Sequence, residues 1–454
     1  IDLRRPDMQK ILRTRHRAIK VIRDYFDEQG FCEIETPFLC KSTPEGARDF
    51  LVPSRLQQSA FYALPQSPQL FKQILMVSGM DKYMQIVRCF RDEDPRADRQ
   101  AEFTQLDLEL SFADVDDVMA VTEGVVRRVW KQILGVDIPT IQRMTYQEAM
   151  TRFGTDRPDL RFDVELIDLS DLATKTDFGV FRGAMQSGGM VKAICVPGGA
   201  GMTRKETDSL AEWAKPLGAK GLAVTKVVGQ QFETGIAKFL TGISRELIER
   251  AGAQDGDLLC FAADNEKIVH RVLGELRVKL ATERGMIEPN QWCWVWVVQF
   301  PLVEWNPEEK RWDSLHHPFT APIDDDVNRL ESETSSVRSK AYDLILNGSE
   351  LGGGSIRIHQ HEIQSRIFRL LGIGEEQART KFGFLLDALQ YGAPPHGGIA
   401  LGIDRLIMHL CKTNNIRDVI AFPKTQTGAD LMTEAPSTVD DGQLKELHLR
   451  TVES

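Results

Sequence analysis

A strict alternation of polar and apolar residues begins at Phe103. One set of positions is Phe103, Gln105, Asp107 and Glu109, and the other is Thr104, Leu106, Leu108 and Leu110. A period of two predicts a β-strand whose apolar face lies on a core. Residues 85–91 predict a partner strand, and the loop between the strands carries Arg91, Arg96 and Arg99. Such a hairpin, with arginines at its bend and a polar platform on its return strand, suits a charged planar ligand such as a nucleotide.

Two further segments show helical periodicity. Near the start of the chain, one apolar stripe consists of Ala18, Val21, Ile22, Tyr25 and Phe26. Near the end, residues 397–402 predict a strand and a glycine turn, and the helix that follows has its buried stripe at Ile403, Leu406, Ile407 and Leu410. Arg405 then lies on the opposite side of the first turn. Because a cation is unfavourable at a helix N-terminus, Arg405 indicates an anionic ligand, with a structural ion pair as the alternative.

The middle of the chain, from about 160 to 288, has a different character. Residues 191–196 and 222–228 predict short strands, Thr203 with Glu206 forms a capping box that opens a helix to about residue 215, and 266–282 predicts an amphipathic helix. Residues 292–298 predict a fully buried strand. We therefore expect an α+β fold with four segments: 1–158, an inserted α+β domain at 159–290, 291–424, and a C-terminal extension at 425–454.

One short helix presents an amide and an ammonium on the same face. Ser67 is expected at its N-cap and Pro68 at its first position. Gln69 and Lys72 are three residues apart and therefore share a face, where they could receive a carboxylate. A solvated helix surface is the alternative.

The Asn347-Gly348 pair predicts a tight β-hairpin. If Leu346 pairs with Ser349, then Asp343 and Glu350 become diagonal neighbours, about 7–8 Å apart at Cα. Two carboxylates so placed repel each other unless a cation lies between them, and magnesium carrying phosphate oxygens is the natural candidate. Two solvated charges at a sheet edge are the alternative.

The residues after this hairpin also alternate. Three glycines, which permit close approach of a ligand, are followed by Ser355, Arg357 and His359 on one polar face. The adjacent His316 and His317 would point to opposite faces of an extended segment. At most one of them should line a given pocket, which argues against a metal site made of both.

The amino-acid composition bears on the cellular location of the protein, but it does not indicate a ligand. We find no apolar run of membrane-spanning length and no secretory h-region in this sequence. Seven scattered cysteines without a CxxC pair predict a reducing, cytoplasmic location and buried, inert thiols, and they argue against structural zinc. The net charge of −10 does not suggest a nucleic-acid partner, although a local basic groove remains compatible with it.

The hairpin sequence RDEDPRADRQAEFTQ at 91–105 resembles motif 2 of the class II aminoacyl-tRNA synthetases. Its residue pattern is similar to that of the bacterial-type aspartyl enzymes. Residues 30–37 (GFCEIETP) resemble motif 1, and 397–406 (GGIALGIDRL) resemble motif 3. The three occur in the family's order and cover nearly the whole chain. The resemblance implies a class II antiparallel sheet flanked by helices, with a GAD-like inserted domain. It also implies an N-terminal OB-fold anticodon-binding domain in bacterial members, which we expect this chain to lack.

The resemblance implies an aspartate–tRNA ligase. Such an enzyme uses ATP and Mg²⁺ to form aspartyl-adenylate and pyrophosphate, and then transfers aspartate to tRNA(Asp), with tRNA(Asn) as a second substrate left open. It also implies a homodimer formed through motif 1, with Pro37 at the seam. The implied catalytic residues are Arg91 and Arg405, and the implied metal ligands are Asp343 and Glu350. The implied ATP-binding residues are Arg91, Asp92, Glu93, Gln100, Phe103, Glu350, Gly402, Ile403, Asp404 and Arg405. The implied aspartate-binding residues are Glu45, Ser67, Gln69, Lys72, Arg91, Gln105, Asp107, His316 and Arg357.

In this scheme Phe103 and Arg405 enclose the adenine, and Arg91 holds the α-phosphate. Lys72 and Arg357 bracket the substrate side chain, so asparagine would leave both charges uncompensated. Ala101 and Pro95 depart from the usual motif 2 wording, but no implied ligand is lost. The asparaginyl and lysyl enzymes fit less well, because they lack the insertion and this motif 2 wording. An aspartate-activating amide-forming enzyme, or a regulatory paralogue that does not charge tRNA, is the alternative.

Overall fold

The computed structural model describes residues 2–43, 47–94, 97–288 and 290–452. These form two compact units. The first contains Ile1–Ile141, Val298–Leu344 and Leu351–Ser454, and the second contains Gln142–Val297 and Ile345–Glu350. The second unit begins before the expected boundary at 159 because α4 (Tyr146–Phe153) packs against the long helix α10 (Glu266–Glu283).

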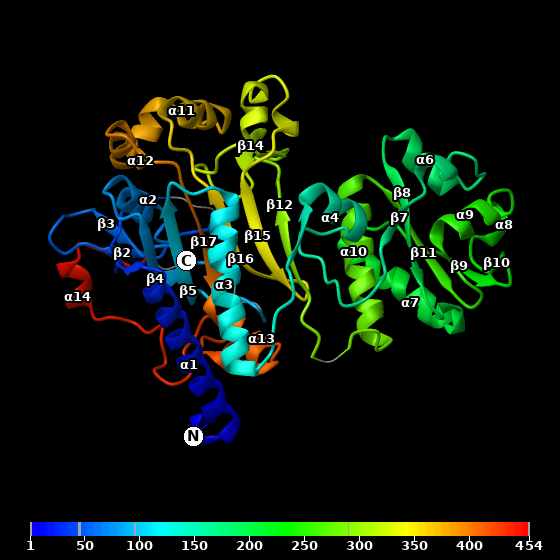
Figure 1. The fold of residues 1–454 in the computed structure, drawn as a ribbon, viewed down its shortest axis with the longest axis horizontal. Coiled ribbons are helices and arrows are strands. Elements are labelled where there is room, and N and C mark those ends of the chain that lie inside the picture. Colours follow the sequence, from blue (N-terminus) through cyan, green and yellow to red (C-terminus); the bar gives the residue numbers. More distant parts are fainter. Residues whose placement is uncertain (1, 44–46, 95–96, 289, 453–454) are drawn as a thin grey trace. The chain divides into compact units, whose positions relative to one another are not determined.

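An antiparallel sheet organises the first unit (Figure 1). Within this unit the strand order of the eight-stranded sheet runs β1-β4-β5-β17-β16-β15. The short β1 pairs with β4 in parallel, whereas β4 with β5, β5 with β17, and β17 with β16 are antiparallel. The strands of the sheet are β1 (Cys32–Glu33), β4 (Lys82–Phe90), β5 (Glu102–Ser111), β15 (Ala341–Leu346), β16 (Ser349–Ile356) and β17 (His396–Gly402). The predicted hairpin is therefore confirmed as β4 and β5, and motif 3 is confirmed as β17 followed by a helix.

Helices and two small hairpins surround this sheet. The helices are α1 (Pro6–Glu28), α2 (Gln69–Val77), α3 (Val115–Leu134), α11 (His361–Leu370), α12 (Glu375–Gln390), α13 (Ile403–Cys411) and α14 (Asp441–Glu446). The hairpin strands are β2 (Leu51–Pro53), β3 (Phe61–Ala63), β13 (Val303–Asn306) and β14 (Arg311–Ser314). Helices α1, α3 and α13 pack on one another, and α2 packs against β5 and α12.

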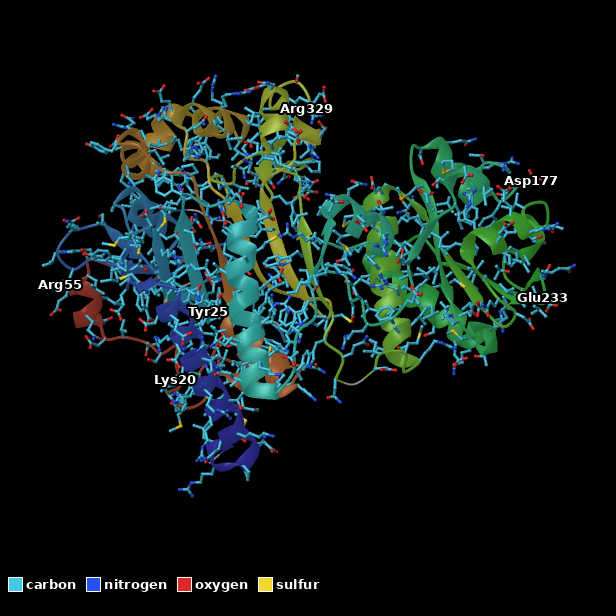
Figure 2. The ribbon with its side chains drawn as sticks, viewed as in Figure 1. Lys20, Tyr25, Arg55, Asp177, Glu233 and Arg329 are labelled. Atoms are coloured by element: carbon cyan, nitrogen blue, oxygen red, sulfur yellow. The ribbon has the colours of Figure 1, made fainter. Side chains whose placement is uncertain are left out.

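The apolar stripe predicted for α1 is confirmed. Ala18, Val21, Ile22 and Phe26 are buried. Figure 2 shows Tyr25 and Lys20 on this helix; the Tyr25 hydroxyl donates a hydrogen bond to the Val121 carbonyl of α3 at 3.2 Å. Lys20 pairs with Asp24 one turn later on an exposed face at 2.7 Å. The helix is thus amphipathic, as its sequence predicts.

The second unit is a sheet covered by helices on both faces. The order of its antiparallel sheet is β10-β9-β11-β8-β7. The strands of this sheet are β7 (Leu166–Asp168), β8 (Met190–Val196), β9 (Ala223–Val228), β10 (Gln231–Glu233) and β11 (Leu258–Asp264). The strands β6 (Gln142–Thr145) and β12 (Trp294–Val298) do not belong to this five-stranded sheet. Its remaining helices are α5 (Ser170–Ala173), α6 (Gly179–Gln186), α7 (Arg204–Ala214), α8 (Ala237–Leu240) and α9 (Ser244–Ala251).

Alternate residues of β8 and β11 enter two separate cores. Ile194 and Cys260 pack with α7 and α10, whereas Ala193 and Phe261 pack with the helices of the other face. This explains why β11 is apolar up to Asp264 and why β8 is apolar apart from Lys192. The capping box of Thr203 and Glu206 at the start of α7 is confirmed.

Candidate active site

Four buried charged side chains meet on the polar face of β5. The Lys72 ammonium lies 2.9 Å from an Asp107 oxygen and 3.2 Å from a Glu109 oxygen. The Arg357 guanidinium donates to both Glu109 oxygens, at 2.9 and 3.0 Å. Each of these side chains is at most 2% exposed. We call Lys72, Asp107, Glu109 and Arg357 the charge cluster.

The position of Lys72 depends on α2. This helix begins at Gln69, with Pro68 at its N-cap, so the prediction that Ser67 caps it was wrong by one residue. The Ser67 hydroxyl still accepts a hydrogen bond from the Gln69 backbone N–H at 3.3 Å. Gln69 and Lys72 are both buried, and the alternative of a solvated helix surface is therefore excluded.

Gly398 of β17 leaves the space that Glu109 occupies. It lies opposite Glu109 in the β5–β17 register. A Cβ atom at position 398 would lie 2.0 Å from a Glu109 oxygen and 2.0 Å from the Leu108 carbonyl oxygen. Because backbone cannot move aside cheaply, only glycine fits here.

Burial and pairing act differently on the two carboxylates of the cluster. Burial raises the pKa of Asp107 to about 6, against the opposing effect of Lys72. Burial also works to raise the pKa of Glu109, but Arg357 and Lys72 together hold it at about 2. Glu109 is therefore a permanent anion at neutral pH, whereas Asp107 titrates in a slightly acidic range.

The two adjacent histidines have different hydrogen-bond partners. His317 Nε2 lies 2.9 Å from an Arg357 nitrogen and 3.4 Å from the Ser355 hydroxyl. Burial, and then the nearby Arg357, lower the pKa of His317 well below its usual value, so its ring is neutral. His316 instead lies 3.3 Å from an Asp343 oxygen. It is thus His317 that contacts the charge cluster, and the assignment of His316 to aspartate stays a prediction.

Two side-chain atoms, one on β5 and one on α2, lack a hydrogen-bond partner among the residues that the structure describes. They are one carboxylate oxygen of Asp107 and the side-chain nitrogen of Gln69, and both are buried. A buried polar group without a partner is costly and asks for a ligand or water. An acceptor and a donor of this kind match the ammonium and a carboxylate of an amino acid.

Four motif 2 residues that were predicted to bind ATP contact other side chains, and they are Arg91, Asp92, Glu93 and Phe103. The Arg91 guanidinium lies over the Phe103 ring at 5.1 Å, a cation–π contact. Glu93 pairs with Arg99 at 3.3 Å, and Asp92 pairs with Arg48 at 3.7 Å. The exposed fractions of these four charged side chains range from 39% to 79%, so their ion pairs are weak and can be exchanged for a ligand.

Two other predicted residues are held by protein partners. A Gln100 side-chain oxygen accepts from the Lys424 backbone N–H at 3.0 Å. Gln105, the other of the two, lies with its side-chain oxygen 3.2 Å from the Cys89 sulfur.

Motif 3 is tied to motif 2 by a buried carboxylate. One Asp404 oxygen accepts from the Thr104 backbone N–H at 2.8 Å, and the other accepts from Arg15 of α1. Both oxygens of the Asp404 carboxylate thus accept hydrogen bonds within the protein, and the assignment of Asp404 to ATP stays a prediction. Ile403 is buried, and Gly402 is the N-cap of α13. Arg405 pairs with Asp98 at 3.7 Å, the ion pair that the sequence left as an alternative.

The β15–β16 hairpin turns at Asn347 and Gly348, as predicted. Both residues have positive φ values, 53° and 77°, which is the type I′ turn expected of Asn-Gly. Asp343 on β15 is buried and Glu350 on β16 is half-buried. No group of three or more potential ligands occurs within the described ranges. Two carboxylates fit Mg²⁺, which fills its remaining positions with water and phosphate oxygens.

Some sequence predictions are not supported by the structure, and some residues of the site were not predicted. Glu45 lies outside the described residues. Of the seven cysteines, only Cys89 and Cys260 are buried and Cys32 is exposed, so the prediction of mostly buried thiols was wrong. Glu109, His317 and Gly398 were not predicted as site residues. Glu109 carried a signal, because the alternation placed it on the polar face with Asp107.

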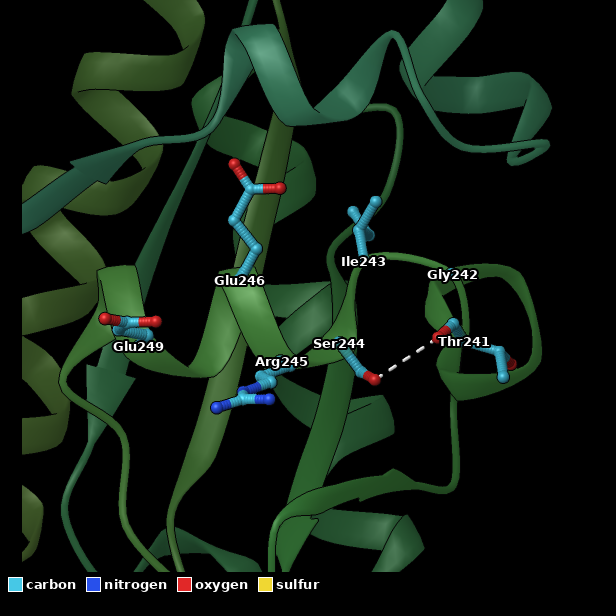
Figure 3. Close-up of a pocket in the computed structure, with 7 residues that line it drawn as sticks. All are labelled: Thr241, Gly242, Ile243, Ser244, Arg245, Glu246 and Glu249. Atoms are coloured by element: carbon cyan, nitrogen blue, oxygen red, sulfur yellow. Dashed lines mark hydrogen bonds between the residues drawn. The ribbon is translucent and has the colours of Figure 1, made fainter.

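A separate cavity of about 290 Å³ lies in the second unit (Figure 3). It is lined by Thr241, Gly242, Ile243, Ser244, Arg245, Glu246 and Glu249. The Ser244 hydroxyl donates to the Thr241 carbonyl at 3.3 Å. None of the predicted site residues lines it, so it gives no support to the proposed chemistry.

Membership of a family follows from comparison with known proteins. The family model for tRNA synthetases class II (D, K and N) matches residues 1–426. The chain belongs to this family, and the predicted class II synthetase fold, with its antiparallel sheet and flanking helices, is confirmed. None of the helices in the part of the chain that the structure describes has the length and apolar character needed to cross a membrane.

The similar curated proteins point to one member of that class. The chain is 57% identical to the aspartate–tRNA(Asp/Asn) ligase of Geotalea uraniireducens, over all of this chain and 77% of that protein. It is 55% identical to the aspartate–tRNA ligase of Halalkalibacterium halodurans, over all of this chain and 76% of that protein. It is 54% identical to the aspartate–tRNA ligase of Agathobacter rectalis, over 98% of this chain and 75% of that protein.

Proposed function

We propose that this chain is an aspartate–tRNA ligase that activates L-aspartate with ATP and transfers it to tRNA. The observation that carries the proposal is the charge cluster, in which Lys72 and Arg357 converge on one carboxylate beside Asp107. A pocket that binds an acidic amino acid needs two cations for the carboxylates and an anion for the ammonium. The names of the similar proteins support the same substrate. No comparison supports an amide-forming enzyme or a regulatory paralogue.

To form aspartyl-adenylate, the protein needs mainly to position the two substrates and to stabilise the charge on the phosphates. The attacking α-carboxylate of aspartate is already ionised, so no general base is required. Arg91 would hold the α-phosphate against this carboxylate, and Arg405 would bind the outer phosphates. Phe103 offers an aromatic face for the adenine, from which the Arg91 guanidinium would move to meet the phosphate.

Asp343 and Glu350 would hold magnesium. When bound, Mg²⁺ neutralises charge on the ATP phosphates. The two carboxylates lie on neighbouring strands of one hairpin, and this placement supports the assignment. The expected outcome of replacing either carboxylate by its amide is a higher Mg²⁺ requirement for activation with unchanged aspartate binding.

We also propose a homodimer formed through motif 1 and a cytoplasmic location. Directly after Pro37, the side chains of Phe38 and Leu39 are 44% and 54% exposed, which is unusual for large apolar residues next to one another. Sedimentation equilibrium of the full chain tests the dimer. A protein that remains a monomer at micromolar concentration would contradict it.

Aspartate-dependent exchange of pyrophosphate into ATP tests activation, and charging of tRNA(Asp) and tRNA(Asn) tests transfer. Exchange with aspartate but not with asparagine or lysine is the expected result. No exchange would exclude the ligase, and exchange without charging of either tRNA would favour the amide-forming alternative. Both tRNAs must be tried, because some of the similar proteins are named aspartate–tRNA ligase and others aspartate–tRNA(Asp/Asn) ligase.

A further inference from the structure

The turn between β15 and β16 is held by more contacts than a turn requires. Asparagine is common in such turns because it tolerates a positive φ, so Asn347 needs no further role to explain its presence. Its side chain, however, is fully engaged with another segment. The Asn347 Oδ1 accepts from the Cys293 backbone N–H at 2.9 Å, and Nδ2 donates to the Gln291 carbonyl at 2.9 Å.

A third hydrogen bond joins the same two segments. The Asn347 backbone N–H donates to the Cys293 carbonyl at 3.0 Å. Asn347 therefore bonds twice to Cys293 and once to Gln291, just before β12 begins. We call these three hydrogen bonds the turn clamp. An asparagine that served only the backbone conformation of the turn would have no need of these hydrogen bonds from its side-chain amide.

Gly348, the other turn residue, lies against Asp159, which is itself held by hydrogen bonding. A Cβ atom at Gly348 would lie 3.0 Å from the Asp159 Cβ, so the turn lies directly against Asp159. The Asp159 carbonyl accepts from a buried Arg277 nitrogen at 2.9 Å. The Arg277 guanidinium also lies 4.4 Å from the centre of the Phe162 ring. This support of the turn is thus held by charge-assisted hydrogen bonding and cation–π packing.

The clamp and the support fix a turn that is close to both proposed metal ligands. Asp343 comes four residues before Asn347, and Glu350 comes three residues after it. Magnesium demands near-ideal octahedral geometry with short ligand distances, so a shift of either strand would weaken it. A site built from only two protein carboxylates has no third ligand to absorb such a shift.

We propose that Asn347 is a positioning residue for the magnesium carboxylates, and that it acts by clamping the β15–β16 turn to residues 291–293. The inference rests on the proposed function, since it takes Asp343 and Glu350 as the ligands of the ATP-bound cation. The turn residue Asn347 and the segment that receives the clamp both belong to the second unit, so the clamp is described within one compact unit.

Asn347→Gly is the decisive variant. Glycine keeps the positive φ and the backbone hydrogen bond to Cys293, but it removes both side-chain hydrogen bonds of the clamp. We expect the Mg²⁺ concentration for half-maximal pyrophosphate exchange to rise about three- to tenfold, in line with the loss of two hydrogen bonds. The rate at saturating Mg²⁺ should return to within about twofold of the rate of the unchanged protein, because the variant keeps both proposed ligands, Asp343 and Glu350.

A second readout does not depend on turnover. Binding of Mn²⁺ in the presence of ATP, followed by electron paramagnetic resonance, should weaken by the same factor, and aspartate binding measured by calorimetry should not change. Asn347→Asp keeps the acceptor for Cys293 and loses the donor to Gln291, so its effect should be intermediate. This variant also serves if Asn347→Gly does not fold.

Asn306→Ala provides the matched control. Asn306 also uses its side chain in a hairpin, donating to Asp313 at 2.8 Å, but β13 and β14 carry no predicted cation ligand. Its Mg²⁺ requirement should stay unchanged. An unchanged Mg²⁺ requirement and Mn²⁺ affinity in both Asn347 variants, with normal exchange in the unaltered protein, would overturn the inference alone. Absence of exchange in the unaltered protein would overturn the proposed function instead.

Discussion

Glu109 holds the Arg357 guanidinium with both of its carboxylate oxygens, at 2.9 and 3.0 Å, and the same carboxylate lies 3.2 Å from Lys72. The two cations of the proposed aspartate pocket are therefore already compensated. This corrects the expectation that asparagine would leave both charges uncompensated. Rejection of asparagine must instead come from its amide N–H groups, which would face donors on Arg357 and Lys72. One buried mismatch of this kind costs about 1–3 kcal/mol.

Replacing Glu109 by glutamine should show how much its negative charge stabilises Lys72 and Arg357. Glu109→Gln leaves two buried cations with one buried anion, and we expect a loss of stability on the order of 3 kcal/mol. The side-chain carboxylate of aspartate can supply the missing charge, whereas asparagine cannot. Aspartate should therefore raise the melting temperature of the variant more than that of the unchanged protein. An equal effect of asparagine would contradict this account.

Replacing Arg357 by leucine should abolish aspartate activation while leaving ATP binding nearly intact. The change removes the bidentate contact with Glu109 and one cation of the pocket, and charge-assisted hydrogen bonds are each worth about 1.5–3 kcal/mol. Calorimetric titration of both ligands in one preparation tests the prediction. Arg357→Lys, which keeps the charge and loses the fork geometry, is the control and should lose less affinity. Unchanged aspartate affinity in Arg357→Leu would refute the assignment.

Activity should fall as the pH drops through about 6. Asp107 must be ionised to receive the substrate ammonium, and burial raises its pKa to about 6. The pH profile of kcat/KM for aspartate should thus lose activity tenfold per unit below that value. His317→Gln should keep the same acidic limb, because the pKa of His317 is lowered well below this range. Loss of the limb in that variant would assign it to the histidine instead.

The same ionisation has the opposite effect on stability. A carboxyl whose folded pKa lies above its unfolded value of 3.8 stabilises the protein most below that value. Its contribution is lost as the pH rises through about 6. Glu109, with its pKa held at about 2, behaves in the reverse sense and stabilises the protein above 4.5. Chemical denaturation between pH 4 and 7 should therefore show Asp107→Asn losing less stability at the higher pH.

Gly398→Ala should remove aspartate activation through packing alone. Its Cβ would overlap the Glu109 carboxylate and the Leu108 carbonyl, each at 2.0 Å, and would displace Glu109 from Arg357. Gly383→Ala in α12 is a matched control, since its Cβ meets only the flexible Arg379 side chain, at 3.7 Å. The control should keep full exchange activity and equal or higher stability. Normal aspartate activation in Gly398→Ala would show that Glu109 can act from another position.

The sequence predicts elements and faces well where a single periodicity governs. The alternation after Phe103 gave β5, the Asn-Gly pair gave the β15–β16 turn, and the capping box gave the start of α7. These signals are local, and tertiary packing did not override them. The two adjacent histidines contact different residues, His316 with Asp343 and His317 with Arg357, but whether they face opposite sides stays a prediction.

Pairing across the sheet could not be predicted from the sequence. The alternation placed Asp107 and Glu109 outward, but it could not show that α2 covers them and makes the platform a buried cluster. The contact of Glu109 with Arg357 joins residues 248 positions apart. The need for glycine at 398 depends on the register between β5 and β17, and no local pattern encodes that register.

The hydrogen bond from Thr104 to Asp404 ties β5 to α13. Thr104 follows Phe103, and Arg405 follows Asp404, so this 2.8 Å link joins the strand and the helix that carry the two residues proposed to enclose the adenine. Under the proposed function, a change at Asp404 would therefore disturb nucleotide binding through the placement of α13, although the Asp404 carboxylate is occupied by protein partners.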